Sequence, residues 1–175
     1  SRVRSVQKAP IQDIFDQINL KFKDLYDANP DSIQDVDFLK RNVGFTGELF
    51  LGHLRYGTFG RNSKESCHPF LRQNNWITRN LVVAGNFNLT NVDELFDVLL
   101  NVGQHPKEKS DTVTVLEKIG HFLDVENDEL YNEFKSEGLS NDEVYAKIAN
   151  EIGIEKILKK ASEDWDGGYT MAGLL

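Results

Sequence analysis

The chain contains little of several residue types that mark particular classes of protein. Its 175 residues include one cysteine, Cys67, so no internal disulfide can form and a reducing compartment is expected. No apolar run approaches the roughly 18 to 20 residues of a membrane-spanning helix. The basic start, Ser1 to Lys8, leads into an amphipathic segment and not into the apolar core of a signal peptide. These absences predict a cytoplasmic protein without a membrane partner.

Basic residues are outnumbered as well. The sequence has 20 Lys and Arg residues against 28 Asp and Glu residues, a formal net charge of −8. Nucleic acids and anionic membranes are bound by clustered Lys and Arg, so this balance argues against a nucleic-acid partner and favours a small ligand. A hydrophobic content of 39% with 10% aromatic residues indicates a globular chain with a core.

The familiar metal and cofactor motifs are missing. The four histidines, at positions 53, 68, 105 and 121, have no Cys, Asp or Glu at zinc-ligand spacing, so structural histidines are expected and no metal site. Neither GxGxxG nor GxxxxGK[ST] occurs, and no nucleotide cofactor is predicted. Cys67 next to His68 suggests a thiol nucleophile, but sequence neighbours rarely place a base against sulfur. We interpret Cys67 as a packing residue.

The hydrophobic pattern predicts helices mixed with a few strands. Apolar positions with helical spacing follow Pro10 until Asn29, and the run 48–51 reads as a strand. A β-hairpin is expected over 70–84, with its turn at 73–75, and an apolar strand at the end of the chain. Further helices are expected over 31–40, from Thr90 as N-cap to Gly103, from Ser110 or Asp111 to Leu123, around Leu130 to Gly138, from Ser140 in a capping box to Ile148, and from Ile152 to Leu158.

Polar residues follow the two central predicted strands and open one helix. Arg55 and Thr58 could bind a carboxylate through a guanidinium fork and a hydroxyl, although Arg55 could equally form an ordinary ion pair. Asn86 and the backbone N–H of Phe87 could stabilise an oxyanion, although such a stretch is often only a turn. Asp111 could pair with an ammonium group or simply begin a helix.

The order of these motifs resembles a known family. The run GHLRYGT at 52–58 is followed by HPF, by AGNFNLTNVDEL at 84–95 and by KSDTV at 109–113. This pattern is similar to the class II, N-terminal-nucleophile glutamine amidotransferase domain, which has GHxRYxT, a strand ending in HNGNLTN, and a TSDSE-like helix start. The resemblance runs from about residue 48 to 117, and weakly to DGGYTMAGLL at 166–175.

The resemblance implies a role for each candidate residue. Arg55, with Thr58, would bind the α-carboxylate of glutamine, and Asp111 would bind its α-ammonium group. Asn86 and the Phe87 N–H would form the oxyanion hole. The tyrosine in GHLRYGT and the NLTN continuation favour those members that pass ammonia to phosphoribosyl pyrophosphate in purine biosynthesis. The alternative is a degenerate, non-catalytic domain kept for amino-acid binding or protein interaction.

The fold implied by the resemblance is α+β, a four-layer αββα sandwich that this chain would contain in part, truncated at both ends. We expect residues 1–175 to be a single domain and an internal fragment. The family's N-terminal cysteine is not present at Ser1, so the isolated chain is expected to be inactive and to self-associate through open sheet edges. Phe87 replaces a family glycine, and it would be strained if that position required a positive φ.

Overall fold

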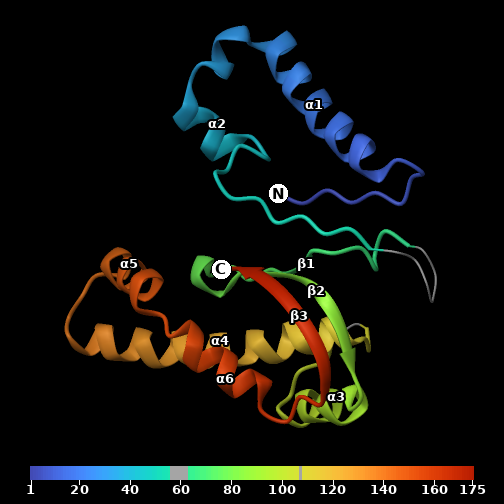
Figure 1. Cartoon of the computed structure of the whole chain (residues 1–175). Helices are drawn as coiled ribbons and strands as arrows, with labels where there is room; N and C mark the ends of the chain where they lie inside the picture. The colour runs from blue at the N-terminus through green and yellow to red at the C-terminus, as the bar shows by residue number, and fades with distance from the viewer. Residues whose placement is uncertain (56–62, 107) are drawn as a thin grey trace. The chain divides into compact units, whose positions relative to one another are not determined.

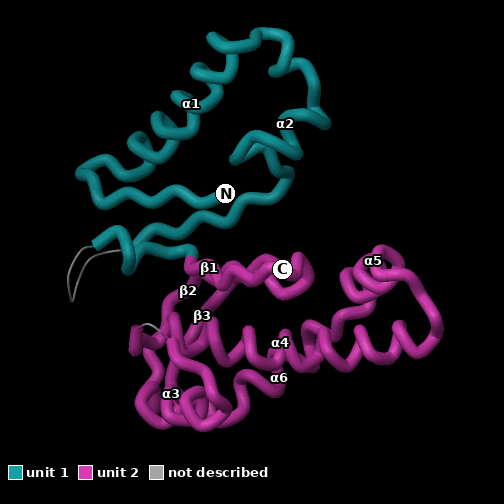
Figure 2. Tube along the Cα trace, turned by 180° about the vertical axis from the view of Figure 1, so that it is seen from behind, with its two compact units in different colours: residues 1–69 teal, residues 70–175 magenta. Residues whose placement is uncertain are grey.

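The computed structural model describes residues 1–55, 63–106 and 108–175. The chain divides into two compact units, unit 1 at Ser1–Pro69 and unit 2 at Phe70–Leu175, which Figure 2 shows in different colours. Within the described ranges, none of the helices combines the length and the apolar character of a membrane span.

Unit 1 is built from helices and irregular segments. Helix α1 (Pro10–Ala28) has Pro10 in its first turn, as predicted, because a proline there gives up only an N–H that the helix does not use. The segment predicted as one helix over 31–40 is instead a 3₁₀ turn, η1 (Pro30–Ile33), followed by α2 (Val36–Asn42). The Asp35 side chain accepts the Phe38 N–H at 2.9 Å, and this cap starts a new helix.

The strand predicted over 48–51 does not form. These residues are irregular, and the side chains of Leu49 and Phe50 are 70% and 68% exposed. A strand is stabilised by a paired neighbour, and the described part of the chain provides none at this run. The apolar pattern alone was therefore misleading.

Unit 2 contains a three-stranded antiparallel sheet in the order β1-β2-β3 (Figure 1). The predicted hairpin pairing is confirmed, since β1 (Phe70–Arg72) pairs with β2 (Leu81–Leu89), but the connection runs over 73–80 and is not the short turn predicted at 73–75. The predicted terminal strand is β3 (Gly167–Leu174), which pairs with β2 along 82–89. Because of this pairing, β2 runs past its predicted end at Ala84.

The described part of unit 2 also contains a 3₁₀ turn, η2 (Ile77–Arg79), and four α-helices: α3 (Val92–Asn101), α4 (Asp111–Ser136), α5 (Asn141–Glu151) and α6 (Ile154–Ser162). Helix α4 packs against β1 and β2, and α3, α5 and α6 pack against α4 (Figure 1). The predicted break between Leu123 and Leu130 is absent, because no glycine or proline interrupts the helix there. The predicted capping box of Ser140 and Glu143 is confirmed.

The N-cap of α3 differs from the prediction. Asn91 takes that position, not Thr90. The Thr90 N–H donates to the backbone oxygen of Asp166 at 2.9 Å, and the Thr90 hydroxyl donates to the Asp166 carboxylate. Thr90 therefore extends the ladder between β2 and the start of β3 and does not cap the helix.

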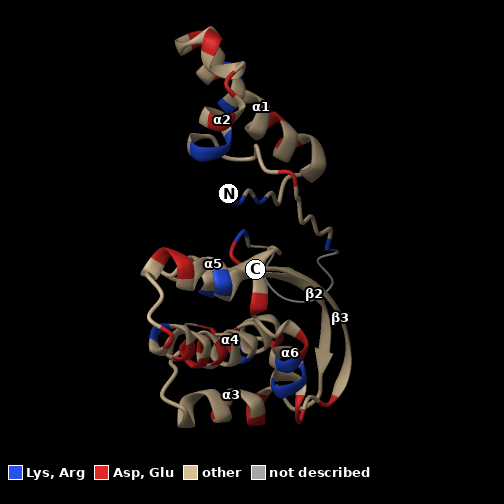
Figure 3. Ribbon diagram, turned by 90° about the vertical axis from the view of Figure 1, so that its left-hand side faces the viewer, with Lys and Arg blue, Asp and Glu red and all other residues tan. Residues whose placement is uncertain are grey.

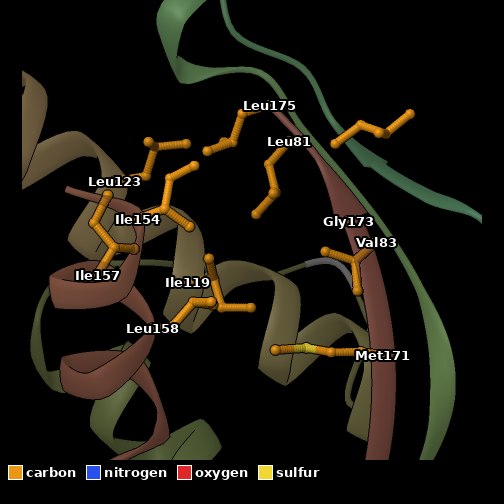
Figure 4. Close-up of a pocket in the computed structure, with 11 residues that line it drawn as sticks. Leu81, Val83, Ile119, Leu123, Ile154, Ile157, Leu158, Met171, Gly173 and Leu175 are labelled. Carbon is orange, nitrogen blue, oxygen red and sulfur yellow. The ribbon is translucent and has the colours of Figure 1, made fainter. Parts of the chain in front are cut away.

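The core of unit 2 lies between the sheet and α4. It is formed by aliphatic side chains from β2, α3, α4 and α6, among them Val83, Leu95, Val115, Leu123 and Ile157. A cavity of about 200 Å³ remains between the sheet and the helices α4 and α6 (Figure 4). Its lining carries no charged side chain, so it is unsuited to a free amino acid.

The mixture of helices with a small antiparallel sheet agrees with the predicted α+β class. The described residues form a single sheet, whereas a four-layer sandwich needs two. The sandwich therefore stays a prediction.

Candidate functional site

Asp111 is connected directly to the second strand of the sheet. It is the first residue of α4, and its carboxylate Oδ2 accepts the backbone N–H of Leu89 at 3.3 Å. The neighbouring Ser110 performs the capping, since its hydroxyl accepts the Val113 N–H at 3.4 Å. Asp111 is thus not needed as the helix cap, and its carboxylate lies at the helix end that favours negative charge.

The hydrogen-bond pattern shows which edge of β2 each N–H faces. In an antiparallel ladder the N–H groups of successive residues point to opposite edges. The Thr90 N–H donates toward β3, whereas the Leu89 N–H donates to Asp111. The N–H of Phe87, two residues from Leu89, therefore faces the same edge as the Asp111 contact. Along the strand the two N–H groups are roughly 7 Å apart.

Phe87 fits a regular strand. Among the described non-glycine residues, a positive φ occurs at Phe45 and Asp164, so Phe87 has no backbone strain of the kind anticipated. Its ring packs against the core of unit 2. The ring also lies over Gly85, where an added Cβ would be 2.8 Å from Phe87 Cζ.

Asn86 lies inside β2, opposite Thr170 of β3, and not in a turn after the strand. Side chains alternate between the faces of a strand, so the amide of Asn86 is on the face opposite the Phe87 ring. Asn86 is exposed. Its amide is therefore accessible, as a donor to a ligand must be.

Arg55 belongs to unit 1 and is exposed, and its Nη1 donates to the Ser66 backbone oxygen at 3.4 Å. No carboxylate of the described residues forms an ion pair with it, which disfavours the ordinary ion-pair interpretation. Thr58 lies outside the described residues. Of the candidate residues, the structure therefore relates Phe87 and Asp111 through one edge of β2 in unit 2, and Asn86 is the neighbour of Phe87 on that strand.

Sequence reasoning missed a pair of histidines in unit 1. The rings of His53 and His68 have centroids 4.5 Å apart, and His68 is only 7% exposed. Burial, and then the positive charges of His53, Arg55 and Arg2, lower the pKa of His68 to about 4. Burial and Arg55 lower the pKa of His53 as well. Both imidazoles are therefore neutral at pH 7, and their 15-residue separation in the chain gave no sign of the contact.

The geometry of Cys67 agrees with a packing role. Its Sγ is 3.5 Å from the Ser63 backbone oxygen and 3.8 Å from that of Ser5, as expected of a thiol that donates to carbonyl groups. Cys67 is half-buried. Across the described residues, no group of three or more His, Cys, Asp or Glu side chains could bind a metal ion.

Comparison with known proteins supports the class suggested by the motifs. Over 102 residues, 51% of this chain, the sequence is 34% identical to an amidophosphoribosyltransferase of Archaeoglobus fulgidus, covering 22% of that protein. Over 117 residues, 67% of this chain, it is 29% identical to a glutamine–fructose-6-phosphate aminotransferase (isomerizing) of Sulfurisphaera tokodaii, covering 19% of that protein. No family model and no solved structure matches.

The chain thus spans about a fifth of the length of these two relatives. Both similarities support a glutamine amidotransferase-like domain. The two relatives carry the names of different enzymes, so the similarity does not extend to one acceptor of the transferred group.

Proposed function

We propose that this chain forms part of the glutamine-binding domain of a class II glutamine amidotransferase. The observation that carries the proposal is the Asp111 carboxylate bonded to the same edge of β2 that the Phe87 N–H faces. A free amino acid with a reacting side chain needs an anionic anchor for its ammonium group and hydrogen-bond donors for the reacting carbonyl. An anchor on a helix and donors on a strand hold the two at a fixed separation.

In this proposal glutamine binds with its α-ammonium group on Asp111 and its α-carboxylate on Arg55, assisted by Thr58. The side-chain carbonyl oxygen accepts hydrogen bonds from the Asn86 amide and the Phe87 N–H. These donors stabilise the negative charge that develops on that oxygen when the carbonyl is attacked. The attacking thiolate is that of the N-terminal cysteine characteristic of the class, and water releases glutamate after ammonia has left.

For the whole protein we propose an amidophosphoribosyltransferase, which passes the ammonia to phosphoribosyl pyrophosphate in purine biosynthesis. The similarity to the amidophosphoribosyltransferase of Archaeoglobus fulgidus and the tyrosine in GHLRYGT support this acceptor. The domain would be an N-terminal-nucleophile sandwich to which this chain contributes the sheet of unit 2. A single cysteine supports a reducing, cytoplasmic setting.

The test measures glutamate release from glutamine by the whole enzyme proposed above. Asn86→Ala removes one oxyanion donor and is expected to lower kcat by about 10²- to 10³-fold. Asn88→Ala is the matched control, because Asn88 is also exposed and lies two residues along the same face of β2. Equal activity of the two variants would refute the assignment of Asn86.

A second candidate, a domain that binds an amino acid without hydrolysing it, is favoured by Phe87 in the place of the family glycine. Calorimetry with glutamine separates the two candidates. A binding domain binds glutamine and releases no glutamate, whereas the enzyme binds glutamine and releases glutamate.

We also propose that the 175-residue chain self-associates. Strand β3 is at the edge of the sheet, and its eight residues carry no charge that would discourage pairing with another strand. Sedimentation velocity is expected to show a concentration-dependent dimer, and a monomer across the micromolar range would contradict this expectation.

A further inference from the structure

The side chain of Asn91 connects the end of β2 to the turn that precedes β3. Its Nδ2 donates to the backbone oxygen of Asp164 at 2.7 Å, and its Oδ1 accepts the backbone N–H of Asp166 at 3.2 Å. Asn91 occupies the N-cap position of α3, yet its side chain makes no capping hydrogen bond. An asparagine at that position normally accepts an N–H from the first turn of the helix. The Asn91 amide therefore holds the turn and not the helix.

The turn over residues 163–166 has a backbone conformation that needs support. Asp164 has a φ of 65°, in the left-handed region that is uncommon for residues other than glycine. Such a conformation persists where surrounding contacts hold it. Besides Asn91, Thr90 contributes, because its backbone N–H donates to the Asp166 oxygen at 2.9 Å. Figure 3 shows acidic positions of this turn in red, where the chain passes from α6 into β3.

Lys118 of α4 holds the other end of the same turn. Lys118 is 5% exposed, and its Nζ donates to the backbone oxygen of Glu163 at 2.6 Å. A buried ammonium group is costly unless it is hydrogen-bonded, so this contact is important for the lysine as well as for the turn. Glu163 is the C-cap of α6, and a positive charge is favourable at that end of a helix. Burial lowers the pKa of Lys118, and the charges of Asp164 and Glu163 oppose this effect.

These contacts form a closed path that includes the candidate site. Asp111 and Lys118 are two helical turns apart on α4 and lie on one face of it. Asp111 binds the end of β2 at the Leu89 N–H, and Lys118 binds the 163–166 turn. Asn91 joins the end of β2 to that turn. The position of the Leu89 N–H relative to the Asp111 carboxylate therefore depends on Asn91 and Lys118.

We propose that Asn91 and Lys118 are positioning residues for the carboxylate of Asp111. The inference rests on the proposed function for the role of Asp111, the binding of the α-ammonium group, and it adds two residues that act through Asp111. Together they keep the end of β2 against the start of α4, so that the Leu89 N–H orients the carboxylate. A carboxylate accepts several hydrogen bonds, so the bond from Leu89 leaves it able to bind an ammonium group.

Amide hydrogen exchange in the 175-residue chain tests the positioning without a substrate. In Asn91→Ala and in Lys118→Met the Leu89 N–H is expected to exchange about 10-fold faster than in the wild type, because its bond to Asp111 opens locally. The Leu123 N–H, in the middle of α4, is expected to exchange within about 2-fold of its wild-type rate. A purely structural role of the two residues would instead accelerate exchange at Leu123 at least as much as at Leu89.

Two variants of unit 2 provide matched controls. Asn150→Ala removes an amide that donates to the backbone oxygen of Ala146 at 2.9 Å, on α5. Lys135→Met removes an α4 lysine that donates to the backbone oxygen of Leu139 at 3.0 Å. Neither contact belongs to the closed path, so both variants are expected to leave the exchange of the Leu89 N–H unchanged.

The second measurement is the KM for glutamine in the whole enzyme proposed above. Asn91→Ala and Lys118→Met are expected to raise KM by about 3- to 10-fold and to change kcat by less than about 2-fold, since they weaken a binding anchor and leave the oxyanion donors in place. Lys118 is buried, so if Lys118→Met does not fold, the half-buried Asn91 decides the test through Asn91→Ala.

The two measurements separate this inference from the proposed function. Unchanged exchange at Leu89, or equal acceleration at Leu89 and Leu123, would overturn the positioning role, and so would faster exchange at Leu89 with an unchanged KM. Faster exchange at Leu89 alone, in a chain whose whole enzyme releases no glutamate, would refute the proposed function and leave the coupling of Asn91 and Lys118 to Asp111 standing.

Discussion

The backbone N–H of Leu89 donates to the carboxylate of Asp111 at 3.3 Å. This contact joins the end of β2 to the start of α4, two elements separated by α3 and the loop that follows it. It also holds the carboxylate at the strand edge that the Phe87 N–H faces. An amide in place of the carboxylate would still accept the Leu89 N–H but would carry no charge.

Asp111→Asn is therefore expected to separate glutamine binding from folding. In the whole enzyme proposed above, loss of the charged partner of the α-ammonium group should raise KM for glutamine by about 10- to 100-fold, the equivalent of about 1.5 to 3 kcal/mol. The unfolding free energy should change by less than about 0.5 kcal/mol, since the contact with Leu89 is kept. Steady-state glutaminase kinetics and urea denaturation measure the two effects.

Asp97→Asn is the control for this experiment, because Asp97 is an exposed aspartate on α3 with no contact to the proposed site. An unchanged KM for Asp111→Asn, or an equal change in both variants, would contradict the role of Asp111.

Gly85→Ala is expected to destabilise unit 2 by about 1 to 3 kcal/mol, because the core there is already close-packed. The added Cβ would be 2.5 Å from the Thr170 backbone oxygen and 2.8 Å from the ring of Phe87. Both tryptophans, Trp76 and Trp165, are in unit 2, so tryptophan fluorescence in urea follows this unit alone.

Gly168→Ala provides the comparison within the same sheet, since no atom lies within 4 Å of the Cβ that it would add. It should change the unfolding free energy by less than about 0.5 kcal/mol. Equal losses for the two variants would mean that strand propensity, and not the close contact at Gly85, decides the effect.

These residues also show what the sequence could reveal about the fold. The hairpin, the capping box at Ser140 and the terminal strand depend on local patterns, and all were predicted. The continuation of β2 through Asn86 and Phe87 depends on β3, more than 80 positions further along. A polar stretch whose pairing strand lies far along the chain is predicted as a turn, because local sequence does not reveal that strand.

For the candidate site, too, the sequence predicted some features and missed others. The order of the motifs predicted Asp111 and Asn86 as site residues. The contact that orients Asp111 comes from the backbone N–H of Leu89, and a backbone group is the same for any residue type, so the sequence could not predict it. The pairing of His53 with His68 was also beyond prediction, because no helical or strand period relates the two positions. Long-range contacts of this kind are set by packing and not by local propensity.

Arg72→Met is expected to cost unit 2 about 3 to 5 kcal/mol, because it leaves two carboxylates without their partner. The Arg72 side chain is 14% exposed, and its guanidinium is 3.1 Å from Glu117 and 2.5 Å from Asp124 on α4. Burial alone would lower the pKa of Arg72, but the two carboxylates outweigh it and raise the pKa. Tryptophan fluorescence in urea measures the loss of unfolding free energy.

Lys159→Met is the surface control for Arg72→Met. Lys159 pairs with Glu155 at 2.8 Å, but both side chains are at least 75% exposed, and such pairs contribute little. If Arg72→Met lowers the unfolding free energy by less than about 1 kcal/mol, the two carboxylates are solvated well enough to need no cationic partner.

The stability of unit 1 is expected to fall as the pH falls from 6.5 to 4. The pKa of His68 is about 4 in the folded chain against 6.5 for an ordinary histidine, so the unfolded state binds the proton more readily. The contribution is fully present above pH 6.5 and amounts to about 3 kcal/mol lost by pH 4. Hydrogen exchange of peptides covering 1–9 and 63–69 measures the change.

His68→Gln should flatten the pH dependence of the stability of unit 1. His105→Gln, at an exposed position of unit 2, should leave that pH dependence intact. A pH profile that His68→Gln does not change would assign the effect to another titratable group.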